Sequence, residues 1–554
     1  MFIEDRDTYV HKMNRTLSDN TRFRPYKIDK RVKKNAFIHA EEKFNRRILN
    51  ILKSFIIPEE IYEKIKSTGS QPARLYGLPK VHKSQTNPKY RPILSMPNAY
   101  CTNLARWLDN ILKTFLPDQF TTKDTFDFVE KLKSLNFQSD KYFTSYDVES
   151  LFTQIPVEET IDYICKFIPN SELPITKATL KELLQLACKN ILFSFDKKLY
   201  EQFDGMCMGS NLGPTMAAFT MHMVETQYKI KPLFYVRYVD DVLAVFNNKT
   251  ESIKIFDHIN NFHKIIRFTQ EHEKDGKLTF LDVEIIKQGT EILTKWHLKA
   301  TNTGTYVPKQ SYSPKSHKTA AIKSLIYRAY RICSSEDLFK ECYSIIESIF
   351  INNGYHYDFI EKIKNKTIKN FHKKQETPRT ITNEETSTIK TKYITINYMR
   401  EHENKLNKVA KLIEDTIGRE NIKICTSYRT RKTQSFFSNK DKIPTCVRSN
   451  IVYSYTCDQC LGHQYIGQSV RHFYTRKHEH INGSANPTEV TSHIHTVKEE
   501  NFAIVVHTKY TSIGESLIYH SVPPSKRLNK YHPPYELELF NCDTYEEAVI
   551  MNNN

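Results

Sequence analysis

Two adjacent aspartates, Asp240 and Asp241, interrupt the apolar stretch from Leu233 to Phe246. The flanking segments are rich in β-branched and aromatic residues, which predicts two buried strands joined at the aspartates. Two carboxylates held a few Å apart repel each other by on the order of several kcal/mol. A divalent cation removes this repulsion, and Mg²⁺ prefers such hard oxygen ligands. The alternative is an acidic turn exposed to solvent, which is common in proteins.

A third carboxylate, Asp147, favours the metal-binding interpretation. It follows the segment Tyr142 to Tyr146, whose composition predicts a strand, and Pro156 is expected to open a helix soon afterwards. Asp147 is therefore expected at the C-terminal end of its strand, as the aspartate pair is. Three carboxylates from neighbouring strands can hold two Mg²⁺ ions, which activate a 3′-hydroxyl group and stabilise a pyrophosphate leaving group.

These strings resemble the palm motifs of reverse transcriptases. YFTSYDVESLFTQIP contains Asp147 and resembles the first motif, and the string around the aspartate pair resembles the last. Between them, GMCMGSNLGPTMAAF (residues 205–219) resembles the template-and-nucleotide loop of the family, where Gly209 allows close approach of the backbone. The resemblance implies that Phe152 lies beneath the sugar of the incoming nucleotide. The metal would then be Mg²⁺, or Mn²⁺ in its place.

A basic segment upstream, RLYGLPKVHKSQTNPKYRPILS (residues 74–95), resembles the fingers motifs, most closely those of Penelope-like retroelements. The resemblance makes Lys80, Lys83 and Arg91 candidate contacts to the nucleotide triphosphate, since basic side chains match phosphate oxygens. A solvated basic loop is the alternative interpretation of this segment by itself.

Residues 267–285 follow the aspartate pair and are expected to form a second hairpin around Asp275-Gly276, a strong turn dipeptide. The second arm, LTFLDVEI, resembles the primer-side strand that follows the palm motifs. Because the family's metal site already has its three carboxylates, Asp282 in this arm is expected to be structural.

A second set of chemically capable residues begins at Asn450. The string NIVYSYTCDQCLGHQYIGQSVRHFYTRKHEHIN resembles the GIY-YIG endonucleases, with Tyr453 in the first triplet and Tyr465 in the second. Two short strands would bring these tyrosines together, and the following helix would carry Arg476 and His480 at i and i+4, on one face. The string departs from the family pattern because the first triplet lacks its glycine.

The resemblance also implies roles for these residues. Tyr453 would act as general base or would position a water molecule, with Tyr465 beside it, and Arg476 would stabilise the charge developing on phosphate. Further along the chain, Glu515 is the candidate ligand of a single Mg²⁺, and Asn529 follows it. The candidate catalytic residues of this segment are Tyr453, Tyr465, Arg476, His480, Glu515 and Asn529.

Cys457 and Cys460 lie between the two triplets in a Cys-X-X-Cys spacing that suits tetrahedral Zn²⁺. Penelope-like endonucleases are similar in carrying cysteines here with distant histidines, which makes His493 and His495 the candidate partners. The alternative is a hairpin with two reduced thiols and no metal. Other histidines compete for the same role: His463 and His480.

The composition agrees with a nucleic-acid partner. The charge balance is 81 − 63 = +18 with a pI near 9.1, which favours a polyanion. No apolar run approaches the roughly 18 residues that span a bilayer, and the polar N-terminus is unlike a signal peptide, so no membrane association is expected. Cysteines without regular spacing indicate a reducing compartment. The lysine-rich runs KRVKKN and RTRK are candidate nuclear localisation signals, but in so basic a chain most such runs are solvated faces or phosphate contacts. The expected location is the nucleus, with the cytoplasm as a further location.

The predicted fold is an α+β multidomain chain, with a right-hand reverse transcriptase followed by a small α/β GIY-YIG domain. Residues 361–392 have few large apolar side chains, so this segment is expected to be mobile. The fingers start close to the N-terminus, which suggests a copy truncated at that end. The predicted divisions are fingers 1–135, palm 136–290, thumb-like helical region 291–355, mobile linker 356–392, connector 393–445 and endonuclease domain 446–554.

The order of these parts is that of Penelope-like elements. It implies RNA-directed DNA synthesis from the 3′-hydroxyl of target DNA that the same chain has nicked. The expected partners are template RNA, a DNA primer, target DNA and deoxynucleoside triphosphates, and the oligomeric state stays open. The alternative is a truncated or domesticated copy that binds nucleic acid and has lost one or both activities.

Overall fold

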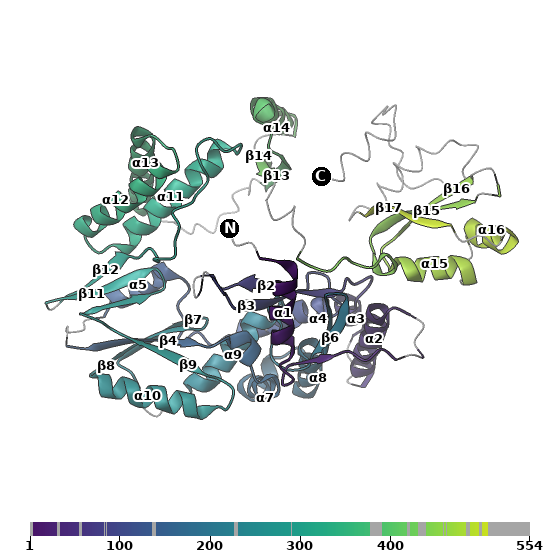
Figure 1. Cartoon of the computed structure of the whole chain (residues 1–554), viewed down its shortest axis with the longest axis horizontal. Coiled ribbons are helices and arrows are strands. Elements are labelled where there is room, and N and C mark those ends of the chain that lie inside the picture. The colour runs from purple at the N-terminus through teal and green to yellow at the C-terminus, as the bar shows by residue number, and fades with distance from the viewer. Residues whose placement is uncertain are drawn as a thin grey trace. The chain divides into compact units, whose positions relative to one another are not determined.

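The chain divides into two units, each assembled from segments that are distant in the sequence (Figure 1). The first unit comprises Met1–Leu116, Ser150–Thr226 and Asn439–Asn554, and the second comprises Pro117–Glu149 and Gln227–Ser438. The computed structural model describes residues 4–29, 31, 34–54, 58–81, 84, 86–135, 140–226, 231–289, 291–376, 390–417, 422–429, 439–457, 459–460, 463–483, 488–497 and 501–507. Among the helices in these ranges, none has the length and apolar character needed to cross a bilayer.

A four-stranded antiparallel sheet in the second unit contains the predicted aspartate hairpin. Its order is β7 (Phe234–Tyr238), β8 (Asp241–Phe246), β4 (Tyr142–Val148) and β9 (Phe268–His272). The central strands β8 and β4 carry apolar residues that are fully buried, as the sequence predicted for this stretch. Helix α10 (Lys249–Phe262) packs on β8 and β9, and the side chain of Asn248 caps its first turn.

The turn predicted at Asp275-Gly276 forms, because Lys274 and Lys277 pair antiparallel across it and exchange both backbone hydrogen bonds. Its arms do not extend into one long hairpin, since the second arm belongs to a three-stranded sheet. β10 (Lys277–Phe280), β11 (Val283–Gln288) and β12 (Glu291–Trp296) pair antiparallel in chain order, whereas β9 pairs only with β4 among the described strands. The expected second arm breaks because Leu281 has a positive φ of 53°, which turns the chain between β10 and β11. Asp282 beside this break forms an ion pair with Arg328, which agrees with a structural role.

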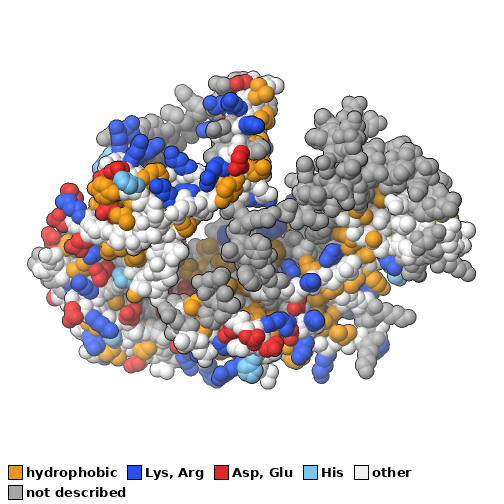
Figure 2. Space-filling model, turned by 45° about the horizontal axis from the view of Figure 1, so that its top comes forward, with side chains coloured by type: hydrophobic (Ala, Val, Ile, Leu, Met, Phe, Trp, Pro, Cys, Tyr) orange, Lys and Arg blue, Asp and Glu red, His pale blue; other side chains and the backbone are white. Residues whose placement is uncertain are grey.

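Three helices follow β12, and one hydrophobic core joins all three of them to both sheets. These helices are α11 (Lys315–Ile332), α12 (Glu336–Asn352) and α13 (Tyr357–Glu376), and α5 (Thr125–Lys133) packs beside α11. The shared core contains Phe143 of β4, Trp296 of β12, Ile326 of α11 and Ile346 of α12. On the face drawn in Figure 2, Lys and Arg side chains gather over these helices.

Helix α13 contradicts the mobile linker predicted from residue 356 onward. Although the segment has few apolar residues, Ile360 is fully buried, and Ile363 and Ile368 pack against the same core. Phe371 contacts the ring of Tyr330 edge-on, at 5.4 Å between centroids. A narrow apolar stripe is therefore enough to hold a helix whose other positions are good helix formers such as Lys and Glu. Residues 377–389 of the predicted linker lie outside the described part.

The connector forms a small parallel β-α-β unit within the second unit. β13 (Lys390–Asn397) pairs in parallel with β14 (Ile422–Arg429), and α14 (Glu403–Ile417) follows the short 3₁₀ turn at Arg400–His402 and packs on β14. Both α14 and β14 fall within the connector predicted at residues 393–445. Parallel strands need such a crossover, because a tight turn cannot join them.

The first unit contains a five-stranded sheet in the order β1-β6-β5-β2-β3. β2 (Ala73–Pro79) and β3 (Tyr90–Ser95) form an antiparallel hairpin at one edge, and β2 also pairs in parallel with β5. Packing between α2, α4 and α8 and between α7 and α9 completes this part. The remaining elements are α1 (Arg6–Leu17), β1 (Phe23–Pro25), α2 (Ala36–Ser54), α3 (Glu59–Ile65), α4 (Thr102–Leu112), η1 (Lys113–Phe115), α6 (Leu151–Gln154), α7 (Val157–Phe167), η2 (Asn170–Glu172), α8 (Lys177–Cys188), β5 (Ile191–Phe195), β6 (Lys198–Gln202) and α9 (Gly213–Glu225).

The C-terminal part of the first unit is a three-stranded antiparallel sheet with two helices. The order is β16 (His463–Ser469), β15 (Ile451–Cys457) and β17 (Phe502–His507), and α15 (Phe473–Asn482) packs with α16 (Glu489–Val497) and with the 3₁₀ turn η5 (Thr445–Val447). The strands and the helix after the second triplet agree with the sequence prediction. Tyr453 and Tyr455 are fully buried in the core of this part.

One loop of the first unit joins residues of the N-terminal segment to this C-terminal part. The Glu41 carboxylate accepts the backbone N–H of Ser70 at 2.6 Å, and the Ser70 carbonyl lies 2.8 Å from Nε2 of the buried His472. Ser449 Oγ donates to the carbonyl of Gly69 at 2.5 Å. Gly69 has a φ of 61°, and a Cβ there would clash with the Val470 carbonyl oxygen.

Candidate active sites

The three predicted carboxylates of the palm-like motifs come together in the second unit. Asp147 of β4 lies directly opposite Asp241 of β8 in the antiparallel register. Tyr238 pairs with Asp241 across the two-residue turn Val239-Asp240, so Asp240 lies at the tip of the same hairpin. The pairing therefore places like charges across adjacent strands, which is destabilising without a counter-ion.

Backbone geometry fixes the turn that carries the aspartate pair. Val239 has a φ of 59°, in the left-handed region that β-branched residues rarely adopt. The Arg237 guanidinium donates to the Val239 carbonyl at 3.2 Å, and the Arg237 backbone pairs with Phe120 and Thr122. Strain of this kind persists where the surrounding structure holds the backbone in place.

The environment of Asp241 resists its ionisation. Burial and then the charges of Asp240 and Asp147 raise the pKa of Asp241 to about 6, even though the charge of nearby Lys299 acts in the opposite direction. One lysine does not offset two neighbouring carboxylates in a partly buried site. A divalent cation would offset the charge of these carboxylates. Three carboxylates on two strands also match the hard oxygen ligands that Mg²⁺ prefers. The residues present therefore fit the predicted metal.

The predicted nucleotide contacts lie in the first unit. Lys80 follows β2 and Arg91 is on β3, so the two belong to one hairpin, whereas Lys83 lies outside the described residues. Phe152 is on α6, and its carbonyl accepts the N–H of Met206 at 2.8 Å. The Phe152 ring lies against Gly213, where a Cβ would approach it to 3.2 Å.

Gly209 is required by the backbone of its loop. Its φ is 129°, and a Cβ at this position would clash with the carbonyl oxygen of Leu94 on β3. The neighbouring Met208 carbonyl accepts the N–H of Leu94 at 2.9 Å. The loop before α9 is therefore fixed against β3 by its main chain, which is the close approach that the sequence predicted for Gly209.

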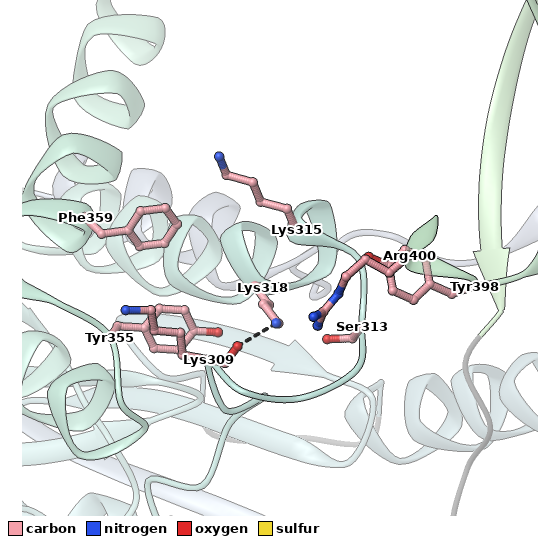
Figure 3. Close-up of a pocket in the computed structure, with 8 residues that line it drawn as sticks. All are labelled: Lys309, Ser313, Lys315, Lys318, Tyr355, Phe359, Tyr398 and Arg400. Atoms are coloured by element: carbon pink, nitrogen blue, oxygen red, sulfur yellow. Dashed lines mark hydrogen bonds between the residues drawn. The ribbon is translucent and has the colours of Figure 1, made fainter. Parts of the chain in front are cut away.

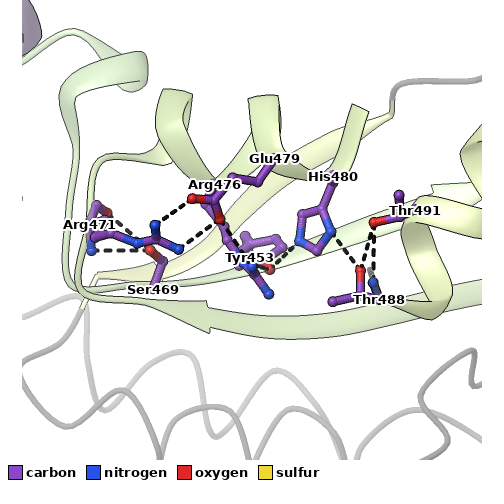
Figure 4. A network of polar contacts seen from close by, with 8 residues as sticks. All are labelled: Tyr453, Ser469, Arg471, Arg476, Glu479, His480, Thr488 and Thr491. Atoms are coloured by element: carbon purple, nitrogen blue, oxygen red, sulfur yellow. Dashed lines mark hydrogen bonds and ion pairs between the residues drawn. The ribbon is translucent and has the colours of Figure 1, made fainter. Parts of the chain in front are cut away.

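A buried polar network in the C-terminal part centres on Tyr453 (Figure 4). The Tyr453 hydroxyl lies 2.6 Å from His480 Nε2 and accepts the Nε–H of Arg476 at 2.9 Å. His480 Nδ1 lies 2.9 Å from the hydroxyl of Thr488. The ring of Tyr465 lies 6.3 Å from that of Tyr453, between centroids. Four predicted residues thus meet, as the sequence suggested.

Burial and charge determine the protonation states in this network. Burial, together with the positive charge of Arg476, lowers the pKa of His480 to about 3, so the imidazole is neutral. Burial also raises the pKa of Tyr453. Arg476 can only donate to the tyrosine oxygen, whereas the imidazole tautomer sets which group donates between Tyr453 and His480 and between His480 and Thr488. Tyr453 is therefore a neutral phenol beside a neutral imidazole.

The candidate zinc ligands are partly assembled. The ligand atoms of Cys457, Cys460 and His493 lie within 4.8 Å of one another. His493 Nε2 is buried and has no hydrogen-bond partner among the described residues. Thiolates and an unpartnered imidazole nitrogen fit Zn²⁺. His480 is engaged by Tyr453 and Thr488, which removes it from the competing ligands.

Several predicted residues cannot be located in the structure. Glu515 and Asn529 lie outside the described residues, as do the side chains of His463 and His495. Sequence reasoning also missed Thr488, whose hydroxyl orients His480, because no motif or spacing connects it to the tyrosine triplets. It missed Lys299 near Asp241 for the same reason.

Two protein-family models match parts of the chain. The model for "Reverse transcriptase (RNA-dependent DNA polymerase)" matches residues 80–295, which contain the three aspartates, and the model for "Animal helix-turn-helix domain" matches residues 305–365. The reverse transcriptase domain predicted from the sequence is therefore present. The helix-turn-helix domain, which α11 and α12 span, was predicted only as a thumb-like helical region.

Solved structures show more distant likenesses. Telomerase from Candida albicans, in complex with a TWJ fragment of telomeric RNA, is 11% identical over 61% of this chain and 65% of its own, with a TM-score of 0.37. The Sicinivirus 3Dpol RNA-dependent RNA polymerase is 15% identical over 56% and 71%, with a TM-score of 0.35. The alignment thus spans less than two thirds of the telomerase chain, and these scores are too low to transfer either activity. No protein with a curated description matches.

The raised pKa of Asp241 predicts that Asp241→Asn stabilises the metal-free protein. The native carboxylate is disfavoured above pH 6, so removing its charge should increase the free energy of unfolding there by on the order of 1 kcal/mol after allowance for solvent screening. The gain should vanish as the pH falls below about 4, where the carboxyl group is protonated in both states. Thermal unfolding in EDTA across this pH range measures it.

The exposed Asp257 on α10 provides the matched control, because Asp257→Asn changes the same charge away from the cluster. Added Mg²⁺ should raise the melting temperature of the native protein and have little effect on Asp241→Asn. Equal melting temperatures for all three proteins in EDTA would contradict the proposed repulsion.

Proposed function

We propose that the chain is an RNA-directed DNA polymerase of the Penelope-like type with a C-terminal GIY-YIG endonuclease, acting in target-primed retrotransposition. The observation that carries the polymerase part is the register of β4 and β8, which sets Asp147 opposite Asp241 beside Asp240. These carboxylates are proposed to hold Mg²⁺ or Mn²⁺. When bound, the metal would supply charge stabilisation for a 3′-hydroxyl nucleophile and a pyrophosphate leaving group.

The chain's own residues supply the positioning in this proposal. The strained Val239 turn fixes the aspartate pair, and the neighbouring strand fixes Asp147. Gly209 holds its loop against β3, which supports a role for that loop in contacting the template or the nucleotide. Lys80 and Arg91 would bind triphosphate oxygens. Positioned charge of this type lowers the barrier because it is in place before the reaction begins.

The endonuclease part of the proposal rests on the network around Tyr453. Tyr453, whose hydroxyl is held by His480 and Arg476, would position the attacking water molecule or, once deprotonated, act as its general base. Arg476, 2.9 Å from the same oxygen, is placed to stabilise negative charge on a phosphate bound there. The proposal also assigns metal binding to Glu515. We extend it to a structural Zn²⁺ at Cys457, Cys460 and His493, with a further histidine such as His495.

The polymerase proposal predicts that Asp240→Asn abolishes primer extension on an RNA template. Losing one ligand of the metal site should slow the reaction by roughly a hundredfold or more, because several kcal/mol of transition-state stabilisation depend on it. Extension of a labelled DNA primer on homopolymer RNA with Mg²⁺ or Mn²⁺ measures the effect.

Asp275→Asn is the matched control for this experiment. Asp275 has a φ of 50° in an exposed turn of the same unit, and asparagine tolerates that conformation. Extension should be unchanged in this variant. If Asp240→Asn extends the primer as fast as the control, the assignment of the metal ligands is wrong.

The endonuclease proposal predicts that Tyr453→Phe abolishes nicking of supercoiled DNA while leaving primer extension intact. The change removes the oxygen that joins Arg476 to His480 and should lower the nicking rate by roughly a hundredfold. Tyr474→Phe, on α15, is the control with the same chemical change. Normal nicking by Tyr453→Phe, with a folded protein by circular dichroism, would exclude this mechanism.

The zinc proposal predicts that Cys457→Ser lowers the bound zinc from one equivalent per chain towards zero. Serine is a far poorer zinc ligand than a thiolate, and the loss should also lower the melting temperature of the C-terminal part. Elemental analysis of the purified chain gives the metal content. Cys425→Ser, on β14, is the control, and equal zinc in both variants would show that the thiols are not ligands.

A further inference from the structure

A basic pocket in the second unit lies outside the proposed active sites (Figure 3). It has a volume of about 360 Å³, at the lower end of the range of roughly 300–1,000 Å³ for ligand pockets. It lies where the chain enters α11, near the start of α13 and beside the residues that follow β13. The residues that line it are Lys309, Ser313, Lys315, Lys318, Tyr355, Phe359, Tyr398 and Arg400.

The charges of the pocket are of one sign. Lysines 309, 315 and 318 and Arg400 contribute four cationic side chains, and none of the described lining residues is acidic. Lys318 Nζ donates a hydrogen bond to the backbone carbonyl of Lys309 at 2.6 Å. This acceptor is neutral, so the bond does not neutralise the positive charge of Lys318. In Figure 3 the polar ends of Lys318 and Arg400 point towards each other. Such an arrangement favours an anion between them.

A buried hydroxyl provides an independent sign of a missing ligand. Ser313 is only 8% exposed, and its Oγ has no hydrogen-bond partner among the described residues. Figure 3 shows this oxygen facing Lys318 and Arg400. A buried hydroxyl without a partner costs free energy, and native proteins seldom keep one unless a ligand or water completes it. Ser313 also precedes the N-terminus of α11, where Pro314 offers no side-chain cap and the helix dipole favours negative charge.

Aromatic side chains form the remaining walls. Tyr355 and Phe359 stack nearly parallel, with centroids 5.9 Å apart and an interplanar angle of 13°. The ring of Tyr398 lies 5.4 Å from that of Tyr312, which carries the Arg400 guanidinium over its face at 5.3 Å. Aromatic faces beside a cationic groove are the combination that binds unpaired bases and their phosphates.

We propose that this pocket binds one nucleotide of a single-stranded nucleic acid. Its phosphodiester group would contact Lys318, Arg400 and Ser313, and its base would lie against the aromatic walls. A single strand is favoured over a duplex because bases in a duplex have no free face to stack on a side chain. The inference adds to the proposed polymerase a strand-holding site away from the aspartates. It does not depend on catalysis, because binding is measured without metal or nucleotides.

The test uses the full chain and a short labelled single-stranded oligonucleotide in EDTA, with binding followed by fluorescence anisotropy. Arg400→Gln should weaken binding by about tenfold and reduce the slope of log affinity against log salt by about 0.7, the value for one phosphate contact on a single strand. Lys340→Gln, which removes one exposed charge from α12, is the matched control and should leave the affinity unchanged.

Ser313→Ala separates this site from a general basic surface, because it changes no charge. It should weaken binding by about fivefold and leave the salt dependence unchanged. It should also raise the melting temperature of the free protein slightly, because a buried unpartnered hydroxyl is removed. Unchanged affinity in both Ser313→Ala and Arg400→Gln, or an equal loss in Lys340→Gln, would overturn the proposal.

Two further measurements test which ligand the pocket binds and whether the pocket acts independently of the polymerase site. Inorganic phosphate or a free mononucleotide should compete only weakly with the strand, and competition as strong as that of an unlabelled strand would overturn the strand-binding proposal. Asp275→Asn, which changes an exposed turn outside the pocket and the aspartate cluster, should bind the labelled strand as the native chain does. Because binding is measured in EDTA without nucleotides, this result is independent of primer extension and of the proposed function.

Discussion

Electrostatic repulsion between Asp147, Asp240 and Asp241 is the constraint on which the rest of the second unit depends. The antiparallel register sets two of these carboxylates opposite each other, and the tight turn sets the third beside them. Burial, and after it the charges of Asp240 and Asp147, raise the pKa of Asp241 to about 6. Such an arrangement is retained only if the surrounding strands are held firmly, and the fully buried residues of β4 and β8 provide that support. The match of residues 80–295 to reverse transcriptases is consistent with this interpretation.

The buried polar network around Tyr453 is stabilised in a different way. Here burial and the charge of Arg476 lower the pKa of His480 to about 3 and keep the imidazole neutral. One positive charge, that of Arg476, therefore remains beside the Tyr453 phenol. Hydrogen bonds, rather than a counter-ion, satisfy Tyr453 and His480. The two centres would therefore respond differently to removal of metal: the aspartates would gain repulsion, whereas the bond between Tyr453 and His480 involves no metal ligand that the structure describes.

The sequence was sufficient where a single local pattern determined the structure. The aspartate hairpin, the strands of Tyr453 and Tyr465 and the helix of Arg476 follow from apolar periodicity and motif order. Local patterns failed where distant packing decided the outcome. Leu281 ends the second arm of the hairpin predicted around Asp275, through a backbone conformation that leucine rarely adopts. Helix α13 forms because Ile360 and its neighbours pack against a core supplied by other segments. Ser313 and Arg400 meet only in the folded chain, so no spacing could have connected them.

The loop at Gly69 has a consequence for how this chain can be dissected. Glu41, Gly69 and Ser70 belong to the N-terminal segment. Their partners belong to the C-terminal one: His472 for Glu41 and Ser70, and Ser449 for Gly69. A protein that ends before Asn439 would expose to water the Glu41 carboxylate and the main-chain carbonyls of Gly69 and Ser70. It would also lack Val470, whose carbonyl oxygen leaves no room for a side chain at residue 69. Expressing the halves separately would therefore alter the surface of each, and point variants in the intact chain are the sounder way to assign activities to its parts.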